Sequence, residues 1–533
     1  MKRFFLLLLC SGWTAVSIQA SPPPDLIAQV HFAGAGQISA DTNALAFTNL
    51  WCSPEAHALR AQTLDKLSRA PYEWLKAKIS PAAGDGTAQL RPLLDDMLSA
   101  EWFLQIRESS NASPEYVLAI HLDSDHALRW DMNLKTILES WTQLPAQKST
   151  FAGQTGWRLV KHEPPDLIGC VRVGNWVVCG CGQNELPLIQ EIAVRILAGK
   201  RPTPPLNNDW LTAELDWPRL AQLFPVLGAV DLPPMQWQAT GRGGNLNFLG
   251  KLTCPQPLPI LLEKWRVPTN TIHRPFVSFA AARGLAPWLE KQGWAQPYEI
   301  SPVPNQLFVW AMAPIPLQTF AAVPVADADH ALAQLGQKLS AHTNWQGLFT
   351  MPFTMVMTNR QISWRGVPFV APNVQALHEP AGDFLVAGVF PNGPKTQPIP
   401  AELLRELGQS NLVYYDWENT AERLKQLPQL TQLGLMLTRH KQLDSDSAAA
   451  RWLKRIGPTL GATATEITQT APNELTFLRK APGGFTAFEL IALANWLEAT
   501  NFPGCDLRLP PPHFRPGPKP VKLLSFPGPP VPH

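Results

Sequence analysis

Charged residues are scarce in this sequence. Asp, Glu, Lys and Arg make up 16% of its 533 residues, against about 25% in typical soluble domains. The 44 basic and 42 acidic residues give a formal net charge of +2, and this excess is due to Lys2 and Arg3. A chain that is otherwise neutral lacks the electrostatic footprint of a nucleic-acid-binding protein. We therefore expect no nucleic-acid partner.

Long apolar runs are missing beyond the N-terminus. A helix that spans a bilayer needs about 20 apolar residues, so we expect no transmembrane segment after the first twenty residues. The N-terminus itself has the basic pair Lys2 and Arg3, an apolar run that starts with Phe4–Leu9, and the small residue Ala20 before a Ser-Pro-Pro-Pro stretch. This order predicts a signal peptide over residues 1–20 and an exported protein, periplasmic or extracellular.

The motifs of common catalytic and cofactor sites are absent as well. The sequence has no His-Glu-x-x-His zinc helix, no Gly-x-Ser-x-Gly elbow and no Ser-x-x-Lys. Gly241–Gly244 is rich in glycine, but it lacks the phosphate-loop lysine and the dinucleotide spacing. Its place between two alternating runs predicts a hairpin turn. We therefore predict no catalytic residue and no cofactor.

What the sequence does contain is an internal repeat. The stretch Asp123–Leu128, Asp-Ser-Asp-His-Ala-Leu, returns as Asp-Ala-Asp-His-Ala-Leu at Asp327–Leu332. The shared order of the matches predicts a tandem duplication of a module of roughly 200 residues. Further matches at offsets of 200 to 208 residues are Trp141 with Trp345, Trp157-Arg158 with Trp364-Arg365, 174–178 with 382–386, and Asp216-Trp217 with Asp416-Trp417.

Each module has the same predicted order of elements: a strand pair, a helix, strands ending in a hairpin, another helix, a strand and a second hairpin. Mixed strands and helices of this kind predict an α+β fold with mixed or antiparallel sheets and packed helices. Gly174-Asn175 and Gly382-Asp383 are predicted as turns of the first hairpins, because Gly supplies the positive φ that such a turn needs. The expected domains are the signal peptide 1–20, a first module 21–265, a second module 266–505 and a tail 506–533.

The first module carries a helical lead that the second lacks. It covers Pro54–Ile79, and its predicted apolar face holds Leu59, Leu64, Leu67 and Trp74.

The C-terminus is rich in proline. Ten of the 24 residues from Pro510 to His533 are Pro, with three basic residues and no acid. Pro fixes φ and removes a hydrogen-bond donor, so an extended, polyproline-like tail is expected. Its basic residues Arg515, Lys519 and Lys522 are suited to contact an acidic envelope polymer or polysaccharide.

The repeated acids and histidines have two interpretations. Carboxylates and imidazoles bind divalent metal ions, but an Asp at a helix start also caps free backbone N–H groups. Both copies keep the packing residues Ala-Leu beside the acids, which favours the structural interpretation, with Asp125 and Asp329 contributing stability as caps. The metal candidates are Asp123, Asp125, His126, Asp327, Asp329 and His330.

Six cysteines remain after the signal peptide, and exported cysteines usually pair. With Gly174-Asn175 as the turn, Cys170 faces Cys179 across the hairpin at a distance that suits a disulfide. Cys181 is the competing partner if the register slips, and buried free thiols are the alternative. In the second module, Ala387 and His378 are expected at the positions of Cys179 and Cys170. The pairing of Cys52, Cys254 and Cys505 stays open.

These observations favour a non-enzymatic exported protein with a binding or envelope-structural role. The alternative is a secreted hydrolase, metal-dependent or not, that acts on a glycan or a peptide. A third hypothesis follows from the 20 Trp against five Tyr: exposed indole rings would stack on sugars, although large aromatic residues also dominate protein cores.

Overall fold

The computed structural model describes residues 25–504, apart from the segments 78, 81–82, 109–113, 161–166, 184, 204–208, 274, 292–301, 314–317, 342–353, 368–369, 392–397 and 427–445. The predicted signal peptide, Trp345, Cys505 and the Pro-rich tail lie outside these residues. Within the described residues, no helix has the length and apolar character that crossing a bilayer requires.

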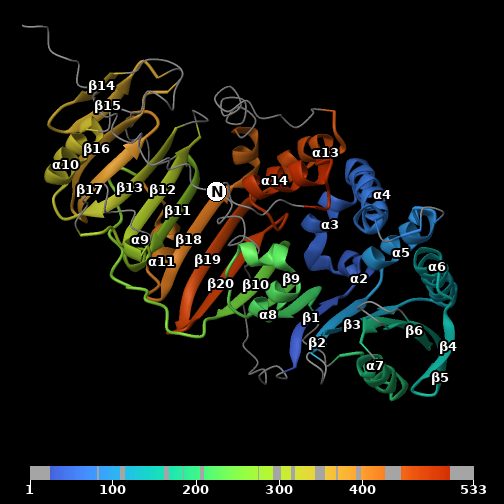
Figure 1. Ribbon diagram of the computed structural model, residues 1–533. Helices are drawn as coiled ribbons and strands as arrows, with labels where there is room; N and C mark the ends of the chain where they lie inside the picture. The colour runs from blue at the N-terminus through green and yellow to red at the C-terminus, as the bar shows by residue number, and fades with distance from the viewer. Residues whose placement is uncertain are drawn as a thin grey trace, which may run out of the picture.

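The centre of the fold is one antiparallel sheet of 20 strands (Figure 1). Its first ten strands are β1 (Leu26–Phe32), β2 (Trp102–Glu108), β3 (Pro114–His121), β4 (Gln147–Phe151), β5 (Gln154–Val160), β6 (Leu167–Val173), β7 (Trp176–Gly182), β8 (Leu211–Leu215), β9 (Met235–Arg242) and β10 (Asn245–Thr253). Its second ten strands are β11 (Phe276–Arg283), β12 (Gln306–Met312), β13 (Thr319–Val325), β14 (Thr354–Met357), β15 (Gln361–Arg365), β16 (Asn373–Glu379), β17 (Gly382–Gly388), β18 (Leu412–Asn419), β19 (Ala462–Ala471) and β20 (Glu474–Ala481).

The order of strands across the sheet is symmetric about its middle. From edge to edge it reads β4-β5-β6-β7-β3-β2-β1-β8-β9-β10-β20-β19-β18-β11-β12-β13-β17-β16-β15-β14. All nine pairings among the first ten strands recur among the second ten, and β10 pairs with β20 at the join. We call residues 25–254 the first half and 276–504 the second half.

An irregularity recurs together with the pairings. The register between β1 and β2 shifts between Leu26 and Ala28, and the register between β11 and β12 shifts between Phe276 and Ser278. Such bulges insert one extra residue and bend the strand. Residues with the same place in these pairings, or in the repeated helix, are called matched positions below.

The helices pack on both faces and at the ends of the sheet (Figure 1). In the first half they are α2 (Ala35–Ala40), α3 (Leu45–Trp51), α4 (Pro54–Leu75), α5 (Thr87–Ser99), α6 (Ser124–Thr142), α7 (Pro187–Leu197) and α8 (Trp217–Leu223). In the second half they are α9 (Ala286–Lys291), α10 (Ala328–Ala341), α11 (Ala401–Leu407), α13 (Ala448–Ile456) and α14 (Ala487–Glu498). The protein is therefore an α+β protein, with a sheet that is antiparallel throughout.

One hydrophobic core is built by helices of both halves. Leu59 of α4 packs in the same cluster as Trp452 of α13 and Leu490 of α14. The rings of Trp51 and Trp452 lie 4.9 Å apart, and Figure 1 shows α13 and α14 beside α3 and α4. Because this core joins segments from both ends of the chain, neither half can unfold without exposing apolar surface of the other.

The predicted helical lead is formed, but one of its packing residues is misplaced. Helix α4 starts at Pro54, and the Ser53 side chain accepts the N–H of Ala56. Proline suits the first helical position because it has no N–H that would need an acceptor there. Leu59 and Leu64 are buried as predicted, whereas Trp74 is 66% exposed. The spacing of the apolar residues along the sequence did not show that the core ends before the last turn of the helix.

The two-residue turn at Gly174-Asn175 is confirmed, because Val173 pairs with Trp176. The corresponding prediction for Gly382-Asp383 is wrong. Gly382 pairs with Glu379, so the turn lies two residues earlier, at 380–381. Both hairpins pair seven residues on each strand, but at its turn end the β16–β17 hairpin extends two residue pairs further beyond the matched positions. Sequence similarity around the glycine does not show this extension.

The match of Asp216-Trp217 with Asp416-Trp417 also fails in the structure. Asp216 follows β8 and caps α8 by accepting the N–H of Arg219, whereas Asp416 lies inside β18 opposite Ala280. The matched position of Asp216 is Asn419, whose side chain likewise accepts a helical N–H, that of Glu422. An Asp-Trp pair is too short a motif to fix a register.

Candidate ligand-binding pocket

The repeated acids of the first half are engaged in local structure. The Asp123 carboxylate caps α6 by accepting the N–H groups of Asp125 at 3.1 Å and His126 at 2.9 Å, and the His126 N–H bond holds the pKa of Asp123 below its usual value. The His126 Nδ1 lies 2.6 Å from Asp96 Oδ1, and the Trp130 indole donates to the other oxygen of Asp96 at 2.9 Å. The cap is Asp123, so the predicted role of Asp125 is wrong: it follows the cap in the first turn.

The second half repeats the cap and adds an ion-pair chain. Asp327 accepts the N–H of His330 at 2.9 Å. Asp329, predicted as a cap, instead lies 3.3 Å from His378 Nε2, while His378 Nδ1 lies 2.9 Å from Asp383. The bond to Asp383 raises the pKa of His378. Among the described residues, no His, Cys, Asp and Glu side chains form a group of three or more that could hold a metal ion.

The cysteine pair has the predicted register but no covalent bond. Cys170 pairs with Cys179 across β6 and β7, and their Sγ atoms lie 2.6 Å apart, longer than the about 2.05 Å of a disulfide. Both are free thiols, and the hydrogen bond to Cys179, together with burial, raises the pKa of Cys170. The matched positions are Val374 and Ala387, so the expected match of Cys170 with His378 is wrong because the β16–β17 hairpin extends two residue pairs further at its turn end.

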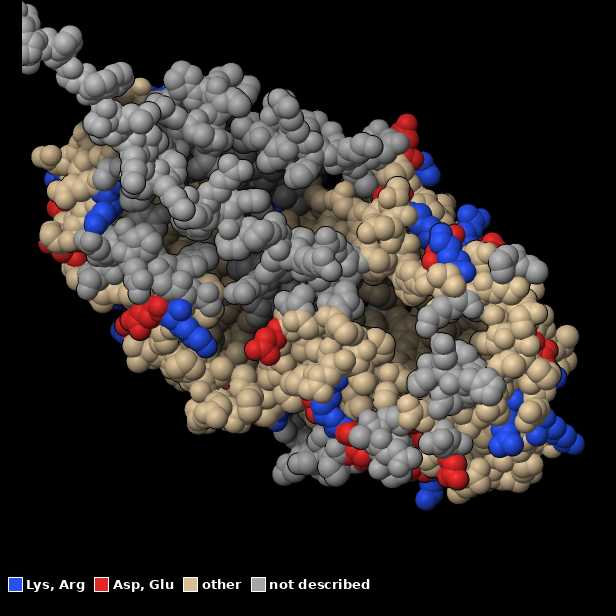
Figure 2. Space-filling view, viewed as in Figure 1, with Lys and Arg blue, Asp and Glu red and all other residues tan. Residues whose placement is uncertain are grey.

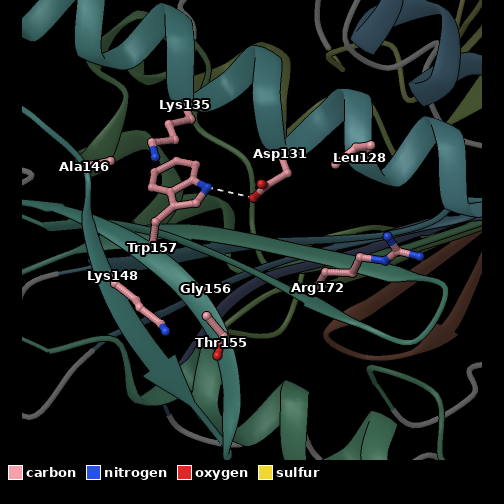
Figure 3. A pocket seen from close by; sticks show the side chains of 9 residues that line it. All are labelled: Leu128, Asp131, Lys135, Ala146, Lys148, Thr155, Gly156, Trp157 and Arg172. Carbon is pink, nitrogen blue, oxygen red and sulfur yellow. Dashed lines mark hydrogen bonds between the residues drawn. The ribbon is translucent and has the colours of Figure 1, made fainter.

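A pocket of about 270 Å³ opens between α6 and the strands β4 to β6 (Figure 3). The buried indole of Trp157 forms one wall, and its Nε1 donates to Asp131 Oδ1 of α6 at 2.8 Å. This bond fixes both the indole and the carboxylate. Six lining residues decide the character of the pocket: Leu128, Asp131, Lys135, Lys148, Trp157 and Arg172.

The charges in this pocket are unbalanced. Three cationic residues, Lys135, Lys148 and Arg172, line the pocket together with one carboxylate, that of Asp131. Within the described part of the chain, neither lysine makes an ion pair, whereas Arg172 donates only to neutral oxygens, such as the Ser124 hydroxyl at 3.2 Å. The charged residues that line the pocket therefore carry a net charge of +2, whereas much of the described surface in Figure 2 is uncharged.

The matched region of the second half is apolar and packs around the buried Leu332. Position by position along α6 and α10, Leu128, Asp131 and Lys135 match Leu332, Leu335 and Leu339. Counted from the hairpin turns, the pair Lys148–Trp157 matches Met355–Trp364, and along β6 and β16 Arg172 matches Ala376. All of these second-half residues pack in one hydrophobic cluster.

A second polar cluster lies near the join and was not foreseen from the sequence. Tyr414, Asp416 and Glu418 share one face of β18. The Tyr414 hydroxyl donates to Asp416 at 2.9 Å, and across β19 the buried Arg479 donates to both oxygens of Glu489 at 2.8 Å. The only signal in the sequence is the alternation of polar residues along this strand.

Burial changes the acidity of these carboxyl groups. It raises the pKa of Asp416 to about 6. It also raises the pKa of Glu418 to about 7, to which the charge of Asp416 contributes, although Glu418 accepts the N–H of Ala487 at 2.7 Å. In the first half, the matched positions of Tyr414, Asp416 and Glu418 are Leu211, Ala213 and Leu215.

Tryptophan is mainly a core residue here. Trp130, Trp210, Trp310 and Trp452 are among the buried residues, while Trp74, Trp288 and Trp496 are exposed on three different helices. The stacking of exposed rings on a sugar chain stays a prediction.

Comparison with protein-family models, with curated proteins and with solved structures finds no match to this chain.

Proposed function

We propose that the protein is an exported, non-enzymatic binding protein that holds a small ligand in the pocket between α6 and β4–β6. The observation that supports this function is the contrast between matched positions. The second half packs Leu335, Leu339 and Met355 into a core, whereas the first half places Asp131, Lys135 and Lys148 around open space. Placing charge where apolar packing is available sacrifices stability, and binding a ligand is the function that such a site supports.

The proposal includes an origin by tandem duplication of a module of roughly 200 residues, over 21–265 and 266–505. Its support is the recurrence of nine strand pairings and of one bulge in the same order. One copy would then have kept or gained the pocket while the other packed it closed. Export by the signal peptide 1–20 and envelope contact through the basic tail 506–533 belong to the same proposal.

Ligand-dependent stabilisation of the purified mature protein tests this function. A library of small metabolites is screened by thermal shift against the wild type and against Asp131→Leu/Lys135→Leu, which carries the residues of the second half. A ligand that raises the melting temperature of the wild type and not of the variant supports the pocket as the binding site. Stabilisation that is equal in both proteins for every ligand, or a complete lack of it, contradicts the proposal.

The alternative function is a secreted hydrolase acting on a glycan or a peptide. It is favoured by Asp416 and Glu418, since carboxyl groups with raised pKa values serve as general acids. The test is an assay for product released from glycan or peptide substrates. Activity that is lost in Glu418→Gln and retained in Asp131→Leu/Lys135→Leu would favour the hydrolase over the binding function.

A further inference from the structure

We propose that the pocket of the first half recognises a small oxyanion, a carboxylate or a phosphate group, through Lys135 and Lys148 with Arg172 at the rim. This inference rests on the proposed binding function and names the chemical class of its ligand. Its starting point is the geometry of Figure 3, in which Lys135 comes from α6, Lys148 from β4 and Arg172 from β6, around the Asp131–Trp157 pair.

The pocket leaves positive charge uncompensated. The single carboxylate, Asp131, is oriented by the Trp157 indole at 2.8 Å, and it makes no ion pair with Lys135 one helical turn away among the described contacts. Lys135 and Lys148 line the pocket from different sides of Trp157 (Figure 3), so an anion bound beside the indole would be attracted by positive charge on both sides.

Some other lysines of the protein have an acidic partner. Lys66, Lys251 and Lys425 each have an acidic partner, at 3.8 Å from Glu498, 2.6 Å from Glu474 and 2.6 Å from Glu422. Unpaired lysines are ordinary on an open surface, but here two of them line the same cavity. Their matched residues, Leu339 and Met355, are apolar, so the fold does not require a cation at either position.

The size and the lining of the pocket restrict the range of ligands that it can hold. A volume of about 270 Å³ is slightly below the about 300–1,000 Å³ that is usual for ligand pockets. Leu128 and the indole of Trp157 provide apolar walls. A small molecule with one anionic group and a short apolar or planar body therefore fits the pocket better than a polymer or a large cofactor.

Isothermal titration calorimetry on the full mature protein tests the inference, with inorganic phosphate and benzoate, which has one carboxylate on a planar ring, as separate probes at low ionic strength. The variants are Lys135→Leu and Lys148→Met, which introduce the matched residues of the second half. The control is Lys454→Met, which removes a charge from an exposed position of α13. We expect saturable, one-to-one binding of at least one probe, weakened by about tenfold or more in each pocket variant and unchanged in the control. The probe that binds identifies the source of the oxyanion.

The outcomes separate this inference from the function on which it rests. If neither probe binds, or if Lys135→Leu and Lys148→Met bind as the wild type does, the oxyanion inference is wrong. If the thermal-shift screen instead finds an uncharged or cationic ligand that depends on the pocket, the inference is wrong and the binding function stands. Circular dichroism spectra and melting curves of the variants confirm that they are folded. Two variants on different elements ensure that misfolding of one does not decide the result.

Discussion

Leu249 of β10 and Leu478 of β20 pair with each other at the join of the two halves, and each occupies the matched position of the other. The neighbouring pairs, Phe248–Arg479 and Gly250–Phe477, are related in the same way. Phe248 matches Phe477 and Gly250 matches Arg479, so exchanging the two strands turns one pair into the other. The strand pairing is therefore symmetric about this leucine pair. Antiparallel pairing makes this possible, because it is unchanged when the two strands are exchanged.

This symmetric frame carries two sites that break the symmetry. The oxyanion pocket exists in the first half and the carboxyl cluster of Asp416 and Glu418 in the second. At each site the matched residues of the other half are apolar. The chain thus contains its own apolar reference for both sites, and the pocket variants introduce the matched residues of the second half.

The core shared by the two halves predicts cooperative unfolding. Trp452 is 1% exposed and packs against Trp51, so Trp452→Ala should lower the free energy of unfolding by about 3–5 kcal/mol. Urea unfolding followed by circular dichroism should show a single transition for both proteins. The control Trp74→Ala, at a 66% exposed position, should change stability by less than about 0.5 kcal/mol. Two separate transitions in the wild type would contradict the shared core.

The helix caps predict a difference between neighbouring acids. Asp123→Ala and Asp327→Ala remove the carboxylates that accept helical N–H groups, so each should cost about 1 kcal/mol of stability. Asp125 is not the cap, and Asp125→Ala should cost clearly less. Chemical denaturation of the three variants measures the difference. An equal loss for Asp123→Ala and Asp125→Ala would show that the caps are assigned to the wrong residues.

The buried carboxyl group of Glu418 predicts a pH dependence of stability. Its pKa in the folded protein, about 7, is above the ordinary value of 4.5. The folded state therefore keeps a proton that the unfolded state releases, and this contribution to stability is present below pH 4.5 and lost as the pH rises through 7. The loss attributable to Glu418 should approach about 3 kcal/mol.

Glu418→Gln should remove this contribution while keeping an acceptor for the N–H of Ala487. The free energy of unfolding, measured in urea from pH 4.5 to 8, should fall less steeply in the variant than in the wild type. Glu402→Gln, which changes an exposed glutamate of α11, is the control and should follow the wild type. Parallel curves for wild type and Glu418→Gln would contradict the assignment.

The register of Cys170 and Cys179 predicts a disulfide when the protein is exported to an oxidising compartment. The bond would close a loop of ten residues and stabilise the protein by about 2.7 kcal/mol on the chain-entropy model. Non-reducing peptide mapping of the secreted protein should find these two cysteines joined. Free thiols at both positions, or Cys170 joined to Cys181, would refute the pairing.

Much of the local structure could be predicted from the sequence, because it depends on nearby residues. The turn at Gly174-Asn175 follows from residues that favour turns. The Asp-x-Asp-His stretches start helices in both halves. In each case the deciding interactions lie within a few residues along the chain.

The sequence by itself thus determined the α+β class, the repeated motif and most of the element order from β2 and from β12 onward, but not the strands β1 and β11. Only the tertiary structure decided the symmetric sheet, the shared core and both sites. Lys135 and Lys148 are separated by a helix end and a strand start, and Asp416 meets its polar neighbours across β19 and β20. Whether a charged side chain lies in a core, at a pocket or on the surface depends on which strands pair and on where each helix packs against the sheet. Those contacts join residues far apart in the chain, which local patterns do not encode.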